Sequence, residues 1–171
     1  HFFIAIDNSG CSAAECELTY GDNRYTVDFD ALERRAADPA VKLMLLCNPH
    51  NPAGRVWTPE ELRRIGDICL RRDILVVADE IHCELVMPGF RYTPFASLSE
   101  EFARRSVTCA SPSKAFNLAG VQVANIFAAD AGLRERIARS LEINETGMIS
   151  PFAIEALTAA YTDGAEWLDA L

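Results

Sequence analysis

Short, continuous apolar runs alternate with helical patterns along this chain, and this alternation restricts the possible folds more than any other feature. Four runs read as strands, at residues 42–47, 74–78, 106–110 and 121–128. Strands that are apolar on both faces belong in a parallel sheet covered by helices on each side. The sequence therefore predicts an α/β fold with three layers, α/β/α, around a mostly parallel sheet.

The segments between the runs carry signals for helices. Thr58 offers an N-cap hydroxyl, Pro59 suits the first helical position, and Glu61 follows the cap by three residues, which together predict the start of a helix. Three further helices are predicted over residues 30–38, 133–141 and 154–161. The apolar residues 1–6 lack a basic n-region, and they are predicted to be a strand cut from a longer protein, not a signal peptide.

The charge balance and the cysteine spacing exclude several classes of partner. The chain has 16 Lys and Arg residues against 25 Asp and Glu residues, a net charge of −9, whereas nucleic acids and anionic membranes bind basic surfaces. No apolar run approaches the ~18–20 residues that cross a bilayer. None of the six cysteines forms a C-x-x-C pair. We therefore predict no metal site, and free buried thiols in a reducing, cytoplasmic environment.

Polar residues gather in the segments that follow the predicted strands, where ligands bind in sheets of this kind. Asn48 and Asn51 each precede a proline, which forces extended or turn geometry on them. This segment is either a plain turn or a rigid mount for an amide that donates to a ligand. Asp79 either caps a helix or pairs with a cation. Lys114 is either a surface lysine or the amine of a Schiff base in a desolvated cleft.

One ligand would use three of these groups. Its aldehyde would react with Lys114, its basic ring nitrogen would pair with Asp79, and its phenolic oxygen would accept a hydrogen bond from an asparagine amide of the segment that holds Asn48 and Asn51. Pyridoxal 5′-phosphate (PLP) has these three handles, and a lysine and an acidic partner at the ring nitrogen are general requirements of this cofactor. The sequence therefore predicts a PLP site.

Three motifs carry a resemblance to a known family. Asn51–Gly54, Asp79–His82 and Ser111–Lys114 occur in the order and at the spacing found in fold-type-I PLP enzymes. The chain resembles the class I/II aminotransferase superfamily over essentially its whole length, and within it the cystathionine β-lyase (C–S lyase) branch known as MalY/PatB. The resemblance implies that residues 1–171 are the central part of the PLP-binding large domain, without its N-terminal segment and without the C-terminal small domain.

The resemblance also implies a role for the residues of these motifs. Lys114 would hold the cofactor and then act as the catalytic general base and acid. Asp79 would pair with the ring nitrogen, and Asn51 would form a hydrogen bond with the ring's O3′. Ser111 and Ser113 would be candidates for binding the phosphate, with Ser111 the better one.

Two positions depart from the pattern of many aminotransferases. His82 stands where many have a tyrosine that contacts O3′, as it does in the lyase branch, and it is carried over as a cofactor contact. Gln122 stands where many have an arginine that grips the phosphate, so a bidentate cationic contact is lost. Phosphate affinity would then depend on hydroxyls, backbone N–H groups and parts of the protein outside this chain.

The resemblance implies a homodimeric, cytoplasmic enzyme with a small amino-acid substrate. A C–S β-lyase would produce a thiol, pyruvate and ammonia, while a class I/II aminotransferase would use the same lysine and ring. A catalytically inactive fragment or PLP-fold scaffold is a third possibility, and this chain alone is predicted to have little turnover. Ser111–Lys114 also fits the S-x-x-K motif of serine acyl enzymes, but the S-D-N and K-T-G partners do not occur.

The remaining residues near the motifs are predicted to be structural. We expect Glu80 and Glu84 to be solvated or ion-paired, and His50 to support the fold of its loop. Trp57 and Phe116 are predicted to pack against other side chains, not to stack on a ligand.

Overall fold

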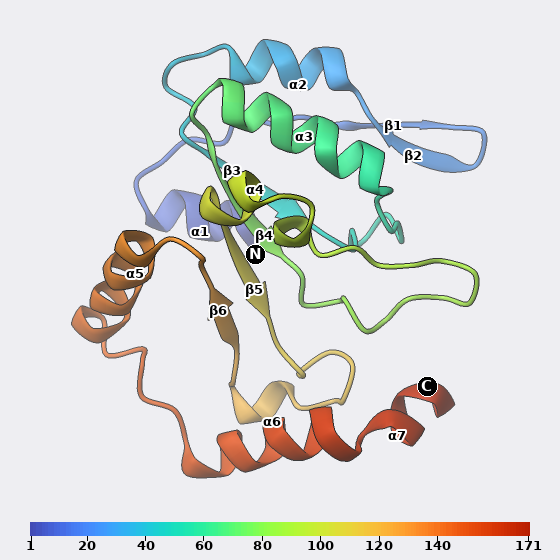
Figure 1. Cartoon of the computed structure of the whole chain (residues 1–171), viewed down its shortest axis with the longest axis vertical. Helices are drawn as coiled ribbons and strands as arrows, with labels where there is room; N and C mark the ends of the chain where they lie inside the picture. The colour runs from blue at the N-terminus through green and yellow to red at the C-terminus, as the bar shows by residue number, and fades with distance from the viewer.

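The computed structural model describes all 171 residues and contains a sheet of four strands. These are β3 (Leu43–Cys47), β4 (Leu75–Asp79), β5 (Ser106–Ala110) and β6 (Asn125–Phe127), in that spatial order (Figure 1). β3, β4 and β5 are parallel, and β6 pairs with β5 in the antiparallel direction. The predicted α/β fold with a mostly parallel sheet is confirmed.

Helices and a separate hairpin surround this sheet. The helices are α1 (Phe2–Asn8), α2 (Phe29–Ala36), α3 (Pro59–Arg71), α4 (Glu100–Arg104), α5 (Ala131–Ile143), α6 (Pro151–Asp163) and α7 (Ala165–Ala170). β1 (Leu18–Gly21) and β2 (Arg24–Val27) form the hairpin, and two short 3₁₀ turns span Phe95–Ser97 and Ala119–Val121. None of these helices has the length and apolar character of a membrane span.

The predicted start of α3 is confirmed in atomic detail. Thr58 Oγ1 accepts a hydrogen bond from Glu61 N at 3.2 Å, and Glu61 Oε2 accepts one from Thr58 N at 2.9 Å. This reciprocal capping satisfies backbone N–H groups that would otherwise lack a partner at the start of the helix. The helix then buries Leu62, Ile65 and Ile68 against the sheet.

Alternate residues of the sheet face two different environments. Val76 and Ala78 of β4 are buried, whereas Val77 and Asp79 are half-buried. The buried side packs under α2 and α3 in a core of 13 buried residues. The other side packs against Leu133 of α5 in a cluster of only three buried residues. Asp79 therefore lies on the more open face.

Residues 2–6 belong to helix α1, and His1 is its N-cap, so the strand predicted over residues 1–6 is wrong. Phe2 and Ile6, four residues apart, are half-buried, while Phe3 and Ile4 are exposed. A continuous apolar run carries no alternation that would select a strand, and the four-residue spacing lets one helical face turn inward.

Two element boundaries also differ from prediction. α2 is capped by Asp28, whose Oδ1 accepts a hydrogen bond from Ala31 N at 2.8 Å, so the helix begins earlier than the predicted start at residue 30. The strand predicted over 121–128 shortens to β6, because Gln122 has a left-handed backbone with a φ of 57°, which an extended strand does not accommodate.

All six cysteines are free as predicted, but of them only Cys69 is buried.

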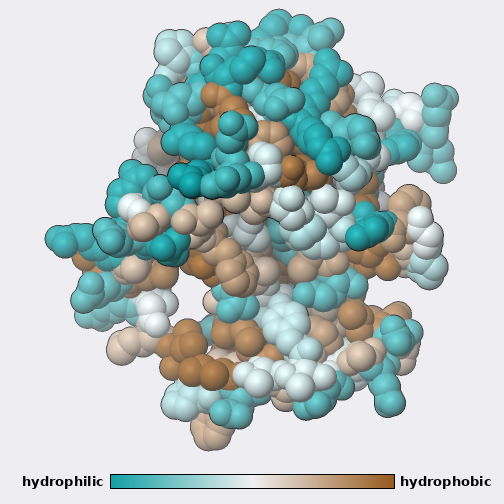
Figure 2. Space-filling model, in the orientation of Figure 1, coloured by the Kyte–Doolittle hydropathy of each residue, from teal (hydrophilic) through white to brown (hydrophobic).

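Apolar side chains are exposed around the start of α6. Met148 and Phe152 are each 83% exposed. In Figure 2, brown apolar atoms gather at the lower left, over the part of the molecule where α6 begins in Figure 1. This surface lies apart from the buried core under α2 and α3.

Candidate functional site

The three predicted site segments all begin at the carboxyl ends of strands of the sheet. Cys47, the last residue of β3, pairs in register with Asp79 of β4, and Asp79 pairs with Cys109 of β5. Asn51 follows Cys47 by four residues, and Lys114 follows Cys109 by five. The structure thus brings the three segments to the carboxyl ends of neighbouring strands, where ligands bind in such sheets. The convergence of the three side chains on one ring stays a prediction.

Asn51 begins a tight turn that is closed by a small bridge. His50 N donates to Arg55 O at 2.7 Å, and Arg55 N donates to His50 O at 3.3 Å. Gly54 within the turn has a φ of 62°, a conformation that side chains with a Cβ rarely adopt. The backbone N–H of Asn51 donates to Cys47 Sγ at 3.5 Å, while the residue itself is exposed. Its amide is therefore mounted on constrained backbone and accessible to a ligand.

Asp79 is a half-buried carboxylate without a cationic partner. Its Oδ1 accepts a hydrogen bond from Ile81 N at 3.2 Å, and none of the ion pairs in the protein includes it. A turn, not a helix, follows at residues 81–84, so the interpretation of Asp79 as a helix cap is wrong. The carboxylate is therefore placed to receive a positively charged group at the edge of the sheet.

The two serines of the lysine segment differ in accessibility. Ser111 is 3% exposed. Its Oγ donates to Val123 O at 2.6 Å and accepts a hydrogen bond from Ser113 N at 3.2 Å. Ser113 itself is half-buried. To bind a phosphate, Ser111 would have to exchange its bond to the Val123 carbonyl for one to the ligand.

Helices α6 and α7 brace the turn that carries Lys114. Trp167 Nε1 donates to Ala115 O at 3.0 Å. Phe116 packs edge-on against Tyr161, with ring centroids 5.8 Å apart, as its predicted packing role requires. Lys114 is exposed and takes part in none of the ion pairs. Its amine is thus unpaired with any carboxylate, while the backbone on which it stands is anchored.

The two histidines near the site have different surroundings. His82 is half-buried in the turn after β4, where Leu85 N donates to His82 O at 3.0 Å. His50 meets the Trp57 ring edge-on, with centroids 5.7 Å apart. Burial lowers the pKa of His50, which favours the neutral imidazole. His50 therefore packs within its loop as predicted.

Glu80 is buried, so the prediction that it is solvated or ion-paired is wrong. It is 1% exposed. Its Oε1 accepts hydrogen bonds from Asn48 Nδ2 at 3.0 Å and from Phe95 N at 2.9 Å, and its Oε2 accepts one from the Tyr92 hydroxyl. Burial raises the pKa of Glu80, and the three hydrogen bonds oppose that rise. Glu84 forms no ion pair either, and its Oε2 is buried without a partner.

Arg55 is a second buried charge that sequence reasoning missed. Its Nη1 donates to Tyr25 O at 2.6 Å, and the guanidinium holds both oxygens of Glu61, at 3.0 and 2.8 Å. It also lies over the Trp57 ring, 4.4 Å from the centroid. Arg55 thereby connects β2, the turn after β3 and the start of α3. The capping glutamate was visible in the sequence, but its second partner was not.

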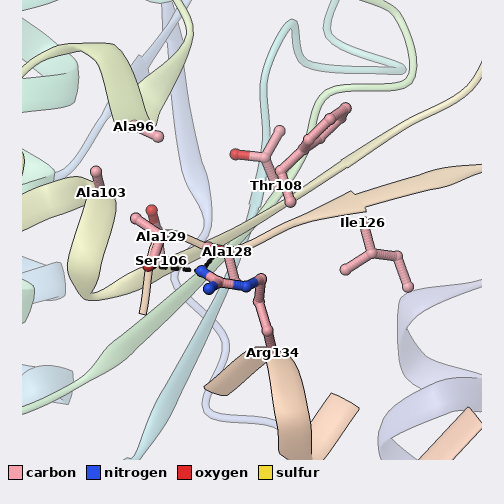
Figure 3. Close-up of a pocket in the computed structure, with 9 residues that line it drawn as sticks. Ala96, Ala103, Ser106, Thr108, Ile126, Ala128, Ala129 and Arg134 are labelled. Carbon is pink, nitrogen blue, oxygen red and sulfur yellow. Dashed lines mark hydrogen bonds between the residues drawn. The ribbon is translucent and has the colours of Figure 1, made fainter. Parts of the chain in front are cut away.

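A cavity of about 360 Å³ lies toward the amino end of β5 and is lined by none of the predicted site residues. Arg134 reaches into it from α5 (Figure 3). Its Nη1 donates to the carbonyls of Ala128 and Ala129, both at 2.7 Å. Because the guanidinium is bound by backbone and the other lining is mainly apolar, the site at the carboxyl edge remains the candidate.

Comparison with known proteins decides the family. The aminotransferase class I and II family matches residues 6–170. The chain belongs to this family. PatB of Bacillus subtilis (strain 168), a cystathionine β-lyase, is 45% identical over 170 residues, which are 99% of this chain and 44% of PatB. MalY of Escherichia coli (strain K12) is 33% identical, over 99% of this chain and 43% of MalY.

A solved structure agrees with these sequence relatives. Cystalysin from Treponema denticola, whose crystal structure contains PLP, matches with a TM-score of 0.96 and 40% identity, over 99% of this chain and 43% of cystalysin. The chain thus spans less than half the length of the relatives it matches. The predicted resemblance to the MalY/PatB branch is confirmed.

Proposed function

We propose that this chain is the central part of the PLP-binding large domain of a C–S β-lyase. The remainder of the complete protein would supply an N-terminal segment and a small domain. The observation that carries the proposal is the position of Asp79: half-buried and without a cation, it ends β4 between the strands that lead to Asn51 and Lys114. The similarity to PatB, a cystathionine β-lyase, supports the reaction, and the similarity to PLP-containing cystalysin supports the cofactor.

The residues present fit the polar groups of PLP. Lys114 offers an accessible amine, Asp79 an unpaired carboxylate, and Asn51 an exposed amide on constrained backbone. When bound, PLP supplies an electron-withdrawing ring that stabilises negative charge at the substrate's Cα. The chain itself has no cation beside Asp79 that would compete with the ring nitrogen.

Each of these residues has a defined task in the proposed site. Lys114 Nζ would hold the cofactor through its aldehyde group, and the same amine would serve as the base that accepts the substrate's Cα proton. The ionised carboxylate of Asp79 keeps the ring nitrogen protonated. The amide of Asn51 donates to O3′, and His82 contacts the cofactor from the turn after β4.

The phosphate is held by hydroxyl and backbone groups in this proposal. Ser113 is half-buried, and Ser111 would join it by releasing the carbonyl of Val123. Gln122, exposed and left-handed, offers no charge to the phosphate. The complete protein would act as a cytoplasmic homodimer and split a sulfur amino acid into a thiol, pyruvate and ammonia.

An aminotransferase is the second candidate, because the family includes such enzymes and every residue above would serve transamination as well. In that case Lys114 would act as general base and then as general acid, and the overall reaction would move the amino group of the substrate to a 2-oxo acid and leave the substrate as its own 2-oxo acid. The complete protein should release pyruvate from L-cystathionine without any added 2-oxo acid. A strict requirement for such an acceptor would contradict the lyase proposal.

A catalytically inactive PLP-fold scaffold is the third candidate. It predicts no turnover of L-cystathionine, with or without an added 2-oxo acid. The lyase proposal instead predicts turnover by the complete protein and little by this chain alone. A visible absorbance band from cofactor bound at Lys114, lost in Lys114→Ala, would show cofactor binding independently of activity.

A further inference from the structure

A buried carboxylate stands beside the proposed site without any cation to neutralise it. Glu80 is 1% exposed, and Asn48, one of its partners, is fully buried at 0%. No ion pair includes Glu80, although burying an uncompensated charge is costly. Neutral donors compensate it instead: the Asn48 amide, the Tyr92 hydroxyl and the Phe95 backbone. A charge retained at this cost needs an explanation.

The partners of Glu80 come from the segments that carry the proposed cofactor contacts. Asn48 is the first residue after β3 and precedes Asn51 by three positions. Tyr92 and Phe95 follow residues 81–91, the excursion that contains His82. The carboxylate of Glu80 therefore ties the start of one site segment to the far end of another.

Backbone hydrogen bonds attach the same cluster to Asp79. Asn48 N donates to Asp79 O at 2.9 Å, and Glu80 N donates to Cys109 O at 2.8 Å. Because adjacent residues along a strand direction point to opposite faces, the side chains of Asp79 and Glu80 lie on opposite sides of the sheet. Asp79 faces the open side of the sheet, while Glu80 turns toward the core that contains Val76 and Ala78.

We infer that Glu80 is a positioning residue that holds Asn51, Asp79 and His82 in the arrangement that binds the cofactor. The inference rests on the proposed function, because it concerns the same PLP site. A carboxylate suits the task, since it accepts from all three donors and brings no donor of its own. Its removal would leave one N–H of the Asn48 amide, the Tyr92 hydroxyl and the Phe95 N–H without acceptors, while the other N–H of Asn48 would still donate to Thr93 O at 3.0 Å.

Substitution of Glu80 in the complete protein tests this inference. Glu80→Ala should weaken PLP binding about tenfold or more, a cost typical of losing groups that orient ligand-binding residues. Glu80→Gln should stay within about threefold of wild type, because its Oε1 keeps both N–H donors and its Nε2 can donate to the Tyr92 oxygen. Tyr92→Phe, which removes one donor, should lie between them.

The matched control is Leu32→Ala, a core substitution in α2. Leu32 is 7% exposed and packs in the main core but forms none of the hydrogen bonds to Glu80, so its truncation lowers the melting temperature without removing a donor or the acceptor of that group. PLP affinity should stay at the wild-type level in Leu32→Ala. If Glu80→Ala or Tyr92→Phe weakens PLP binding no more than Leu32→Ala does at a similar loss of stability, the inference is overturned.

Hydrogen exchange in the cofactor-free protein separates this inference from the proposed function. In Glu80→Ala, amide protection should fall at residues 48–51 and 92–95 and persist in α3, whereas Glu80→Gln should retain it. Unchanged protection in Glu80→Ala would refute the positioning role whatever PLP does. Wild-type protein that fails to bind PLP would refute the proposed function, and the exchange result would still decide whether Glu80 holds these segments.

Discussion

The two faces of the sheet are built for different purposes. The face that contains Val76 and Ala78 is sealed by α2 and α3 over a core of 13 buried residues. The face that contains Val77 and Asp79 has a cluster of three buried residues under α5. Stability is therefore concentrated on one face, and the proposed chemistry stands at the carboxyl end of the other. Asp79 and Glu80 show the division within two adjacent residues.

The largest effect on activity should come from replacing Lys114, which follows the carboxyl end of β5. Lys114→Ala removes the proposed general base and the covalent attachment point, so lyase activity of the complete protein should fall on the order of 10³-fold or more. Because Lys114 is exposed and outside the ion pairs, thermal stability of the cofactor-free protein should not change.

Lys42→Ala is the control for this substitution. Lys42 and Lys114 are the only lysines of the chain, and Lys42 precedes β3 at the amino end of the sheet. Its replacement should leave pyruvate release unchanged. Equal losses of activity in the two variants would place the reactive lysine elsewhere.

A pair of leucine truncations measures the difference between the buried and the open side directly. Leu62 is 0% exposed under the sealed face, whereas Leu43, in β3, is 47% exposed. Leu62→Ala should lower the free energy of unfolding by about 3 kcal/mol, and Leu43→Ala by less than about 1 kcal/mol. Urea denaturation would report both values, and similar losses would show that the two sides contribute equally.

The carboxylate at the end of β4 should affect cofactor binding more than stability. Asp79→Asn removes the charge that pairs with the ring nitrogen but keeps the size of the side chain. A hydrogen bond to a charged group is worth about 1.5–3 kcal/mol, so PLP affinity should fall roughly 10- to 100-fold. Equilibrium dialysis with PLP measures it, and an unchanged affinity would remove Asp79 from the site.

The smallest effects concern the pH dependence of stability, where Glu80 and His50 act in opposite directions. Burial raises the pKa of Glu80 in the folded protein. Its stabilising contribution is complete below the unfolded pKa, about 4.3, and is lost as pH rises through the folded pKa. Burial lowers the pKa of His50. Its contribution is complete above about pH 6.5 and is lost as pH falls through the folded pKa.

Unfolding measurements between about pH 4 and pH 8 would separate these two contributions. Glu80→Gln should reduce the loss of stability that accompanies rising pH. His50→Gln should flatten the loss on the acid side. A Glu80→Gln variant with the pH profile of the wild type would contradict the assigned direction for Glu80.

Local and nearest-neighbour patterns made the sheet and the site edge predictable. The apolar runs of β3, β4 and β5 and the capping signals of α3 act within a few residues, so they are legible in the sequence. The start of the chain was misjudged as a strand because an unbroken apolar run suits a helix as well. The hairpin β1–β2, whose turn residues Asp22 and Asn23 both have positive φ, was overlooked.

The burial of Glu80 and Arg55 could not be predicted from the sequence, for a different reason. Glu80 is satisfied by Asn48, 32 residues earlier, and by Tyr92 and Phe95, 12 and 15 residues later. Arg55 finds a carbonyl of Tyr25, 30 residues earlier. Which distant donor meets which acceptor depends on loop closure in three dimensions, and no local pattern in the sequence records it.

The most direct test of the central claim is to locate the lysine that carries PLP. The complete protein, loaded with PLP, would be treated with borohydride, digested and mapped by mass spectrometry. We predict a single pyridoxyl group within this chain, on Lys114. A modified Lys42, or a chain with no modification on Lys114, would contradict the proposed site.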